Sequence, residues 1–475
     1  MMLQHILLLL MSIKSIIGVN NLMTINDNLI DSVPEYTRFF TVDELFNHAR
    51  ITTLQHSNLT RYQIVGHSRN AEAIPMLSIG NGSKSVLLYA CPHPNEPIGS
   101  LLVDFLLDAL FEHTTLLMKY TWHLLPCVDP DGTRLNEGWF AGPFTIRHYA
   151  QYYYRPAVEE QVEWTFPITH KKYSWNKPPN ETQALMNAIQ HAQPDFVYGL
   201  HNSGFGGMYY YISPPMFDIF PELERLPSLL DLFLATGEPE TPWIIQFAPG
   251  IFRPVSLRTA YDYYEKYATS DPVTIMSGGG TTFDYLEDIG LNNSIFLMAE
   301  LPHFQSSAAA NDTIIPNMTR RDVLLLGLDR DDESSAILVN LVKRIQDMMT
   351  LESPFYRASC SLLSLYKTRA AGLRQALIND NSTLIPATVA RYVDAVYISM
   401  FYKMLVASMF NRAILLQLTQ SSSNVKILED AHIELESYLT SWISDIEQNL
   451  SYSPVSIRKV VQAQLGAMLA VLPKV

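Results

Sequence analysis

The sequence predicts an α/β protein, with a central sheet flanked by helices, followed by an all-helical C-terminal region. Hydrophobic residues make up 48% of the 475-residue chain and charged residues only 17%, which is enough apolar material for a sizeable core and excludes a disordered or fibrous protein. Short apolar runs alternate with helical periods as far as about residue 301. From about residue 353, glycine and strand-like alternation fade and long amphipathic runs replace them.

The predicted sheet is built from apolar runs in the first two thirds of the chain. Residues 83–91, 122–128, 195–201 and 294–301 each have the length and composition of a buried strand, and 208–212 follows closely on the third. A helix is predicted over 98–112, because its apolar residues recur at three-to-four spacing: Leu101, Leu102, Phe105, Leu106, Ala109 and Leu110. Strands separated by helical stretches favour an α/β sheet with covered faces.

The C-terminal region is predicted to be a helical bundle of about 120 residues. Its clearest amphipathic runs cover residues 389–418 and 425–450, and a further helix is predicted ahead of it, over 335–349. We therefore predict three parts: a signal peptide over 1–24, the α/β domain over 25–351, and a helical region over 352–475.

The N-terminus and the glycosylation triplets favour a secreted protein. The apolar run 6–13 has the length of a signal-peptide core and is too short to span a bilayer, although no lysine or arginine precedes it. Asn-x-Ser/Thr triplets occur about twice as often as chance predicts. They begin at Asn58, Asn81, Asn180, Asn292, Asn311, Asn317, Asn381 and Asn449. No later stretch reaches about 18 uninterrupted apolar residues, so we predict no membrane span.

Charge and cysteine content exclude two further classes. Lysine and arginine total 33 against 47 acidic residues, a formal net charge of −14. Proteins that bind duplexes usually carry a basic face, so nucleic acid is not an expected partner. The three cysteines are too few for a disulfide framework, and no Cys-x-x-Cys pair indicates a structural zinc.

Two histidines and a glutamate have the placement of a zinc site. His93 and Glu96 form a His-x-x-Glu in the loop between the strand 83–91 and the helix 98–112. Composition alone produces about one such motif, so the inference depends on its position. The carboxyl end of a parallel strand faces the crevice where α/β proteins bind ligands. Zinc accepts nitrogen and oxygen ligands and needs a third one, for which His201, at the end of another strand, is the candidate.

Glu300 is the candidate base. It ends the apolar run of the strand 294–301, where a carboxylate is out of place unless it faces a site or a partner. Zinc-assisted hydrolysis needs a group that takes a proton from water, and a strand-end carboxylate can do so. The alternative is a rim carboxylate in a salt bridge.

Six segments in the same order resemble the zinc carboxypeptidases of the carboxypeptidase A type. Residues 62–80 are similar to that family's first β-hairpin, 92–99 to its zinc-binding loop, and 128–132 (Val-Asp-Pro-Asp-Gly) to its Asn-Pro-Asp-Gly turn. Leu200 and His201 match the strand with its second zinc histidine. Residues 277–285 resemble its Ser-Gly-Gly…Asp-Trp segment, and 299–301 resemble its catalytic Glu-Leu. The resemblance covers roughly residues 35–350.

The resemblance implies a mixed, mostly parallel sheet and one Zn²⁺ per chain, bound by His93, Glu96 and His201. Glu300 would act as general base and then as general acid. Arg134, just after the Asp-Gly turn, would polarise the scissile carbonyl and steady the oxyanion.

Two further roles follow from the turn segment and its neighbours. Asn136 is the nearest match to the family's Asn-Arg pair, which grips a substrate carboxylate, but Glu137 stands where the arginine should be. Arg147, Arg155 or Arg253 could substitute for the missing arginine. Asp129 would orient His93, or alternatively only stabilise the turn.

The resemblance implies a zinc metallopeptidase that acts on peptide substrates, most simply as a carboxypeptidase. A zinc deacylase of the aspartoacylase and succinylglutamate desuccinylase type is the alternative enzyme, and an inactive binding protein on the same scaffold is the alternative outside catalysis. The aromatic-rich segment 149–175 either lines a substrate cleft or packs an insertion. The sequence does not indicate the oligomeric state.

Overall fold

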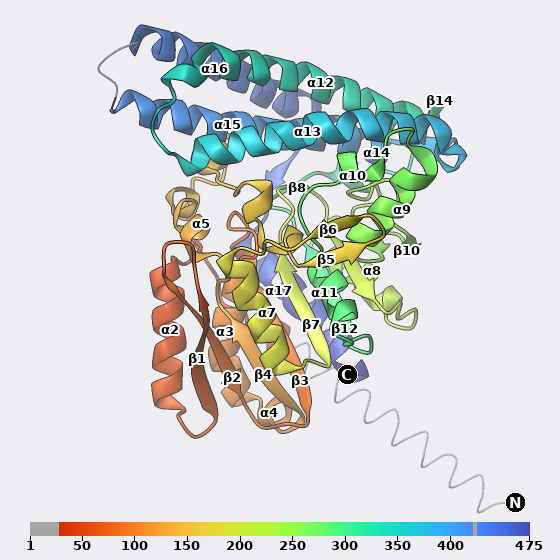
Figure 1. Ribbon diagram of the computed structural model, residues 1–475. Coiled ribbons are helices and arrows are strands. Elements are labelled where there is room, and N and C mark those ends of the chain that lie inside the picture. The colour runs from red at the N-terminus through yellow and green to blue at the C-terminus, as the bar shows by residue number, and fades with distance from the viewer. Residues whose placement is uncertain (1–27, 421–424) are drawn as a thin grey trace, which may run out of the picture.

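The computed structural model describes residues 28–420 and 425–475, and the predicted signal peptide 1–24 lies outside them. A nine-stranded sheet forms the centre of the α/β part (Figure 1). Its strands lie side by side in the order β1 (Thr60–His67), β2 (Ala73–Ile79), β4 (Tyr120–Leu125), β3 (Lys84–Ala90), β7 (Phe196–His201), β12 (Ile295–Glu300), β9 (Tyr209–Ser213), β11 (Ile251–Phe252) and β10 (Gln246–Ala248).

The sheet is mixed, as expected, and its centre is parallel. The strands β4, β3, β7 and β12 run parallel to one another, whereas β9 is antiparallel to β12 and the β1–β2 hairpin is antiparallel throughout. All five predicted strands are present within a few residues of their predicted bounds. The predicted α/β fold class with a helical C-terminal region is thereby confirmed.

Helices cover both faces of the sheet. The alternation along β3 shows why: Val86 and Leu88 face one core, and Leu87 and Tyr89 face the other. On the first face lie α2 (Val42–Gln55), α3 (Ile98–Glu112) and α17 (Ile457–Val471), and α3 has the bounds that its apolar periodicity predicted. On the second face lie α7 (Asn180–Ala192) and α11 (Thr282–Asp288).

Shorter elements fill the connections. The helices are α4 (Thr114–Lys119), α5 (Pro130–Arg134), α6 (Ile146–Tyr152), α8 (Phe220–Leu229), α9 (Leu257–Tyr267) and α10 (Pro272–Ile275). The small strands are β5 (Ile168–His170), β6 (Tyr173–Trp175), β8 (Phe205–Gly206), β13 (Phe304–Gln305), β14 (Ile314–Thr319), β15 (Pro386–Thr388) and β16 (Ser453–Pro454).

Long helices form a layer across one end of the α/β part (Figure 1). They are α12 (Arg320–Ile345), α13 (Pro354–Asn379), α15 (Ser399–Leu418) and α16 (Val425–Asn449), with the short α14 (Val389–Val393) and a π-helical segment (Asp394–Ile398) leading into α15. The helix predicted over 335–349 begins fifteen residues earlier. Thr319 caps it, its hydroxyl accepting a hydrogen bond from the backbone of Asp322, whose carboxylate accepts one from the Thr319 backbone.

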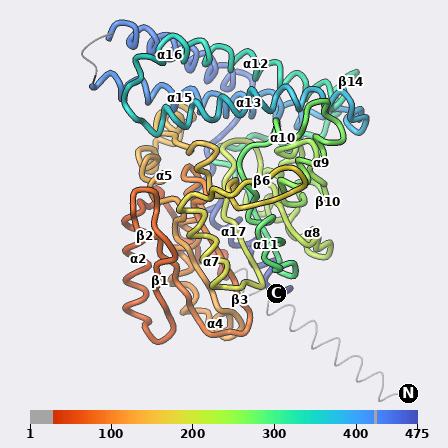
Figure 2. The backbone as a smooth tube through the Cα atoms, in the orientation of Figure 1, coloured from red at the N-terminus to blue at the C-terminus, as the bar shows by residue number. Residues whose placement is uncertain are grey.

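The chain path crosses between the two parts more than once. After the helical layer the chain returns to the sheet, where α17 packs against α3 and α8 (Figure 2). The proposed division at residue 351 stays a prediction.

The stretch Val389–Leu418 is long and apolar enough to cross a membrane, but 67% of its most apolar window is buried within the protein, and among the described residues it is the one such stretch. Core packing accounts for that apolar composition.

Candidate metal centre

Sheet order brings the four predicted residues of the site together. His93 and Glu96 lie in the loop between β3 and α3, and His201 and Glu300 are the last residues of β7 and β12. The strand β7 lies between β3 and β12, and Glu300 is paired in register with His201. All four side chains therefore reach the same carboxyl edge of the parallel sheet.

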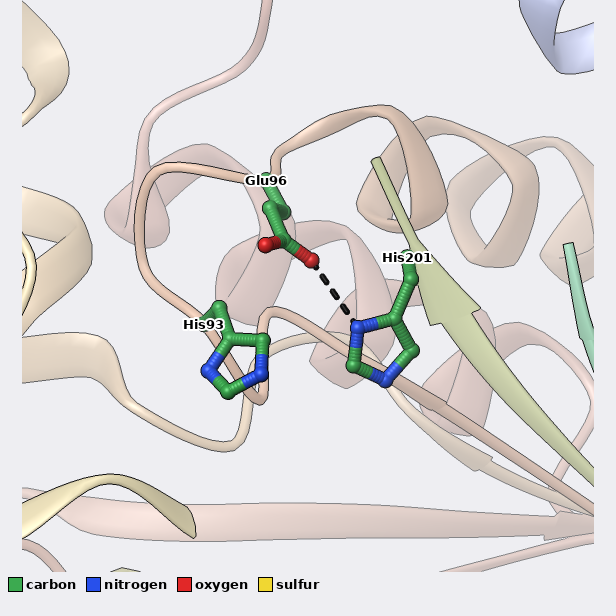
Figure 3. A group of neighbouring side chains, drawn as sticks. All are labelled: His93, Glu96 and His201. Carbon is green, nitrogen blue, oxygen red and sulfur yellow. Dashed lines mark hydrogen bonds and ion pairs between the residues drawn. The ribbon is translucent and has the colours of Figure 1, made fainter. Parts of the chain in front are cut away.

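His93, Glu96 and His201 form a group that fits a metal ion. Each is buried and offers one ligand atom, and these atoms all lie within 4.8 Å of one another. Figure 3 shows the three side chains pointing toward a common centre, with Nδ1 of His201 3.0 Å from Oε2 of Glu96. Nδ1 of His93 is buried without a hydrogen-bond partner. An unpartnered buried nitrogen beside a carboxylate and a second imidazole is the donor set that zinc prefers. It is the one such group within residues 28–420 and 425–475.

Close packing holds the ligand loop against β7. A side-chain carbon built on Gly99, in the first turn of α3, would lie 2.4 Å from Cβ of Leu200, so only glycine allows this approach. The side chain of Asn202 accepts a hydrogen bond from the backbone of Ile98 at 3.0 Å, and its backbone donates to Glu96 at 3.2 Å. The loop and the end of β7 are thereby fixed to each other.

Arg155 and Glu163 complete the surroundings of the three residues. Nη1 of Arg155 donates to Oε1 of Glu96 at 2.9 Å. Oε1 of Glu163 lies 3.7 Å from Nε2 of His201, the ring nitrogen that faces away from Glu96. Hydroxyl groups of Tyr89 and Thr282 donate to the Glu163 carboxylate. The distance of 3.7 Å is that of an ion pair and not of a hydrogen bond, and Nε2 of His201 has no hydrogen-bond partner. A carboxylate at this place favours positive charge on the ring of a metal-binding histidine.

Neither Arg155 nor Glu163 was singled out for these roles from the sequence. Both lie in the aromatic segment 149–175, which was noted only for its rings, and Arg155 was one of three candidates for binding a carboxylate. Their placement depends on how that segment folds back over the strand ends. No local feature of the sequence separates Glu163 from the other acidic residues of that segment, Glu159 and Glu160.

Burial and neighbouring charges set the protonation of the site. Burial lowers the pKa of His93 well below its usual value, and the Arg155 charge adds to this effect, so His93 is neutral near pH 7 and free to bind a cation. Burial opposes the charge on His201 as well, but its contacts with Glu163 and Glu96 raise its pKa well above the usual value. Burial raises the pKa of Glu300, and the His201 charge opposes this shift. A bound cation would act against the shifts of His201 and Glu300.

The site opens into one large cavity. Its volume is about 820 Å³, and the three candidate ligands, Glu300 and Arg155 line it. Oε1 of Glu300 lies 3.8 Å from Nδ1 of His201. The α12, α13 and π-helical segments of the helical layer line the same cavity. The helical layer therefore covers the strand ends and forms a wall of the site.

The structure does not bring Arg134 or Asn136 into the cavity. Arg134 turns to the surface, where it binds Glu72 at 2.6 Å and Asp43 at 2.7 Å. The Asn136 amide is buried, and its nitrogen donates hydrogen bonds to the backbone carbonyls of Gly132 and Tyr154. Neither residue is among those that line the cavity, and the polar atoms of both side chains already bind other groups of the fold.

Three other sequence candidates also lie elsewhere. The Asp129 carboxylate accepts hydrogen bonds from the backbone of Gly132 and from Arg69, and burial raises its pKa to about 7. These contacts stabilise the turn. Arg147 contacts Thr440 on α16, and Arg253 lies over the ring of Phe283. Of the three substitute arginines, only Arg155 lines the cavity.

Comparison with known proteins agrees with the resemblance seen in the sequence. The model of the zinc carboxypeptidase family matches residues 48–215. Similar solved structures include bovine thrombin-activatable fibrinolysis inhibitor in complex with tick carboxypeptidase inhibitor (12% identity, 55% of this chain, 86% of that chain, TM-score 0.34). Another is carboxypeptidase A from Helicoverpa armigera (11% identity, 76% of this chain, 81% of that chain, TM-score 0.37). No curated protein matches the chain.

Proposed function

We propose that this chain, whose residues 48–215 match the zinc carboxypeptidase family, is a zinc-dependent metallopeptidase that acts as a carboxypeptidase. One zinc ion per chain is bound by His93, Glu96 and His201. The observation that carries the proposal is the convergence of these three buried side chains within 4.8 Å on the floor of a large cavity. Three protein ligands and an open cavity are what a catalytic zinc needs.

The chain's own residues supply the remaining chemistry. Zinc bound there polarises a carbonyl and lowers the pKa of water. Glu300 takes the proton from the attacking water and later passes it to the leaving amine, because its carboxylate faces the same cavity. Arg155 takes over the role that the sequence suggested for Arg134, since its guanidinium lies beside Glu96 and can donate to a developing oxyanion.

A peptide substrate is favoured over a small acyl amino acid. A cavity of about 820 Å³ lies near the upper end of the range for small-molecule sites and has room for several residues of a peptide. Its aromatic lining includes Tyr153, Trp164 and Tyr209. In an assay of hydrolysis, the deacylase alternative predicts turnover of acyl amino acids, and the inactive binding protein predicts no turnover.

A substrate screen on the zinc-loaded protein tests the proposal. Amino-terminally blocked peptides of two to five residues are compared with N-acyl amino acids such as N-acetylaspartate, with product amines detected by mass spectrometry. A carboxypeptidase releases single C-terminal residues from the peptides. Turnover restricted to the acyl amino acids favours the deacylase, and no turnover of either class in a zinc-loaded protein favours the binding protein.

We also propose that the protein enters the secretory route. All eight asparagines of the Asn-x-Ser/Thr triplets are exposed in the folded chain, so each can carry a glycan without unfolding. Expression of the full chain in a eukaryotic secretory host, followed by peptide N-glycosidase, tests this. A mass decrease on deglycosylation supports the proposal, and an unglycosylated protein confined to the cytosol contradicts it.

A further inference from the structure

One arginine in the cavity has no counter-charge. Arg369 lies on α13, in the helical layer, and lines the same cavity as the candidate zinc ligands. Within the described parts of the chain no carboxylate forms an ion pair with Arg369, and its guanidinium donates no hydrogen bond. Two of the three other cations of the cavity wall are paired: Arg155 with Glu96 at 2.9 Å, and Lys403 with Asp331 at 3.3 Å. The third, Lys367, forms no ion pair among the described residues either, but it is exposed, so water can solvate its charge.

The groups around Arg369 are donors and aromatic rings. Tyr366, one turn earlier on α13, and Tyr264 on α9 line the cavity with Arg369. Both tyrosines are near enough to oppose the lowering of its pKa by burial. The ammonium group of Lys403 lies 3.0 Å from the centroid of the Tyr366 ring and holds that ring in place. The indole nitrogen of Trp243, whose ring is 5.2 Å from that of Tyr264, is buried without an acceptor. This end of the cavity therefore offers hydrogen-bond donors and lacks an acceptor of matching charge.

The acidic residues of the cavity do not supply the missing charge. Glu238 binds Arg320 at 2.7 Å, and Asp332 binds Arg374 at 2.7 Å. Glu163 accepts hydrogen bonds at the metal end, and Glu240 accepts one from Tyr209 at 2.9 Å. Their contacts direct them to other groups, so the charge of Arg369 is left for a ligand.

An arginine without a partner is costly for the fold. Arg369 is half-buried, and this burial lowers its pKa. A guanidinium stays charged in proteins, so the partial desolvation cost is not relieved by losing the proton. An apolar side chain of similar length would avoid this cost. The arrangement is therefore more readily explained by binding than by stability.

We propose that Arg369 binds a carboxylate of the substrate, so that the helical layer supplies the anion recognition that Asn136 and Glu137 do not. That this carboxylate belongs to a substrate rests on the proposed peptidase function. Binding of a carboxylate by Arg369 does not itself require turnover. It also gives the C-terminal helices a role, as a wall that sets which substrates fit. Tyr264 and Tyr366 are the neighbouring donors for the same carboxylate.

Binding to the metal-free full-length protein tests the assignment without turnover. The probes are N-benzoylglycine, which has a free C-terminal carboxylate; N-benzoylglycinamide, which has none; and N-benzoylaspartic acid α-amide, which has a side-chain carboxylate only. Dissociation constants are measured by calorimetry for wild type, Arg369→Met and Arg369→Lys. A charge-assisted pair predicts that wild type binds an acid about 10- to 100-fold tighter than the amide, that Arg369→Met loses this preference, and that Arg369→Lys keeps part of it.

A matched control is the nearby Lys367, an exposed lysine of the same cavity wall. Lys367→Met should leave the acid preference unchanged. Arg369→Met should also unfold at the same temperature as wild type or higher, since an unpaired charge is removed. The probe that shows the preference identifies the source of the carboxylate, C-terminal or side chain.

Two results overturn the assignment: no preference for either acid in wild type, or a preference that Arg369→Met retains. Failure of the peptidase proposal is seen separately. An Arg369-dependent acid preference in a zinc-loaded protein that hydrolyses nothing would support the carboxylate site and contradict the peptidase function. Zinc-dependent peptide hydrolysis with a substrate preference that does not depend on Arg369 would contradict the carboxylate site alone.

Discussion

Replacing Glu163 by glutamine is expected to weaken zinc binding although Glu163 is not a proposed ligand. The substitution keeps the shape of the side chain and removes its charge. In the structure, Oε1 of Glu163 lies 3.7 Å from Nε2 of His201, on the side of the ring opposite Glu96. The carboxylate stabilises the positive charge that an imidazole gains when its other nitrogen binds a cation.

The size of the effect follows from that distance. Two full charges 3.7 Å apart attract each other by about 4.5 kcal/mol at an effective dielectric constant of 20. A metal-bound imidazole carries only part of a charge, and the side-chain oxygen of the glutamine keeps part of the attraction. We therefore expect about 1.4 to 2.7 kcal/mol, a 10- to 100-fold rise in the zinc dissociation constant.

Competition with a chromophoric chelator measures the zinc affinity of wild type and Glu163→Gln. Glu181→Gln is the matched control, because Glu181 is an equally buried glutamate whose carboxylate binds Arg69 at 3.1 Å, away from the candidate ligands. It should leave the zinc affinity unchanged. Equal affinities of wild type and Glu163→Gln, with both proteins folded, would refute the reasoning.

Three further predictions concern packing, pH and a residue outside the cavity. Gly99→Ala should lower the free energy of unfolding by about 1 to 3 kcal/mol in urea, because its Cβ would lie 2.4 Å from Cβ of Leu200; an unchanged midpoint contradicts the close packing. Burial lowers the pKa of His123 to about 4, so the unfolded chain binds a proton that the folded chain does not between pH 6.5 and 4. The neutral His123 therefore contributes in full to the free energy of unfolding above pH 6.5, and this contribution falls by up to about 3 kcal/mol as the pH drops to 4. His123→Gln should reduce the dependence of the free energy of unfolding on pH in this window. Arg134→Ala should cost less than about 1 kcal/mol of stability, since Arg134 is one-third exposed, and should leave hydrolysis unchanged; a large loss of turnover would return Arg134 to the site.

The candidate ligands could be predicted because strand ends are visible in a sequence. His201 and Glu300 each end an apolar run, and His93 follows another, so the general rule for parallel sheets places all three at one edge. The order in which the strands lie side by side in the sheet cannot be read from the sequence. That β7 lies between β3 and β12, which sets Glu300 opposite His201, depends on pairing between distant segments.

Arg155, Glu163 and Arg369 show where sequence reasoning stops. Nothing local distinguishes them from other charged residues. Arg155 contacts Glu96, 59 positions away, and Glu163 lies beside His201, 38 positions away, whereas Arg369 has no ion-pair partner among the described residues. Arg134 shows the converse. It had the right position after the Asp-Gly turn, but Glu72 and Asp43 hold it at the surface.

The start of α12 was missed for a similar reason. Five charged residues at 329–333 and the glycine at 327 interrupt the apolar periodicity from which the helix 335–349 was predicted. In the structure, a side-chain carbon on Gly327 would lie 2.4 Å from the carbonyl oxygen of Ala395, so the glycine allows α12 to approach the π-helical segment. Tertiary packing here outweighs the helix-weakening effect of glycine.

Zinc content measured together with peptide hydrolysis tests the central claim most directly. Purified wild type, His93→Ala and Glu300→Gln are analysed for metal by mass spectrometry and assayed on the same blocked peptide. We predict about one zinc per chain in wild type and in Glu300→Gln, loss of zinc in His93→Ala, and hydrolysis by wild type alone. A folded wild type that takes up no zinc at micromolar supply, or a Glu300→Gln protein that hydrolyses the peptide at the wild-type rate, would contradict the account.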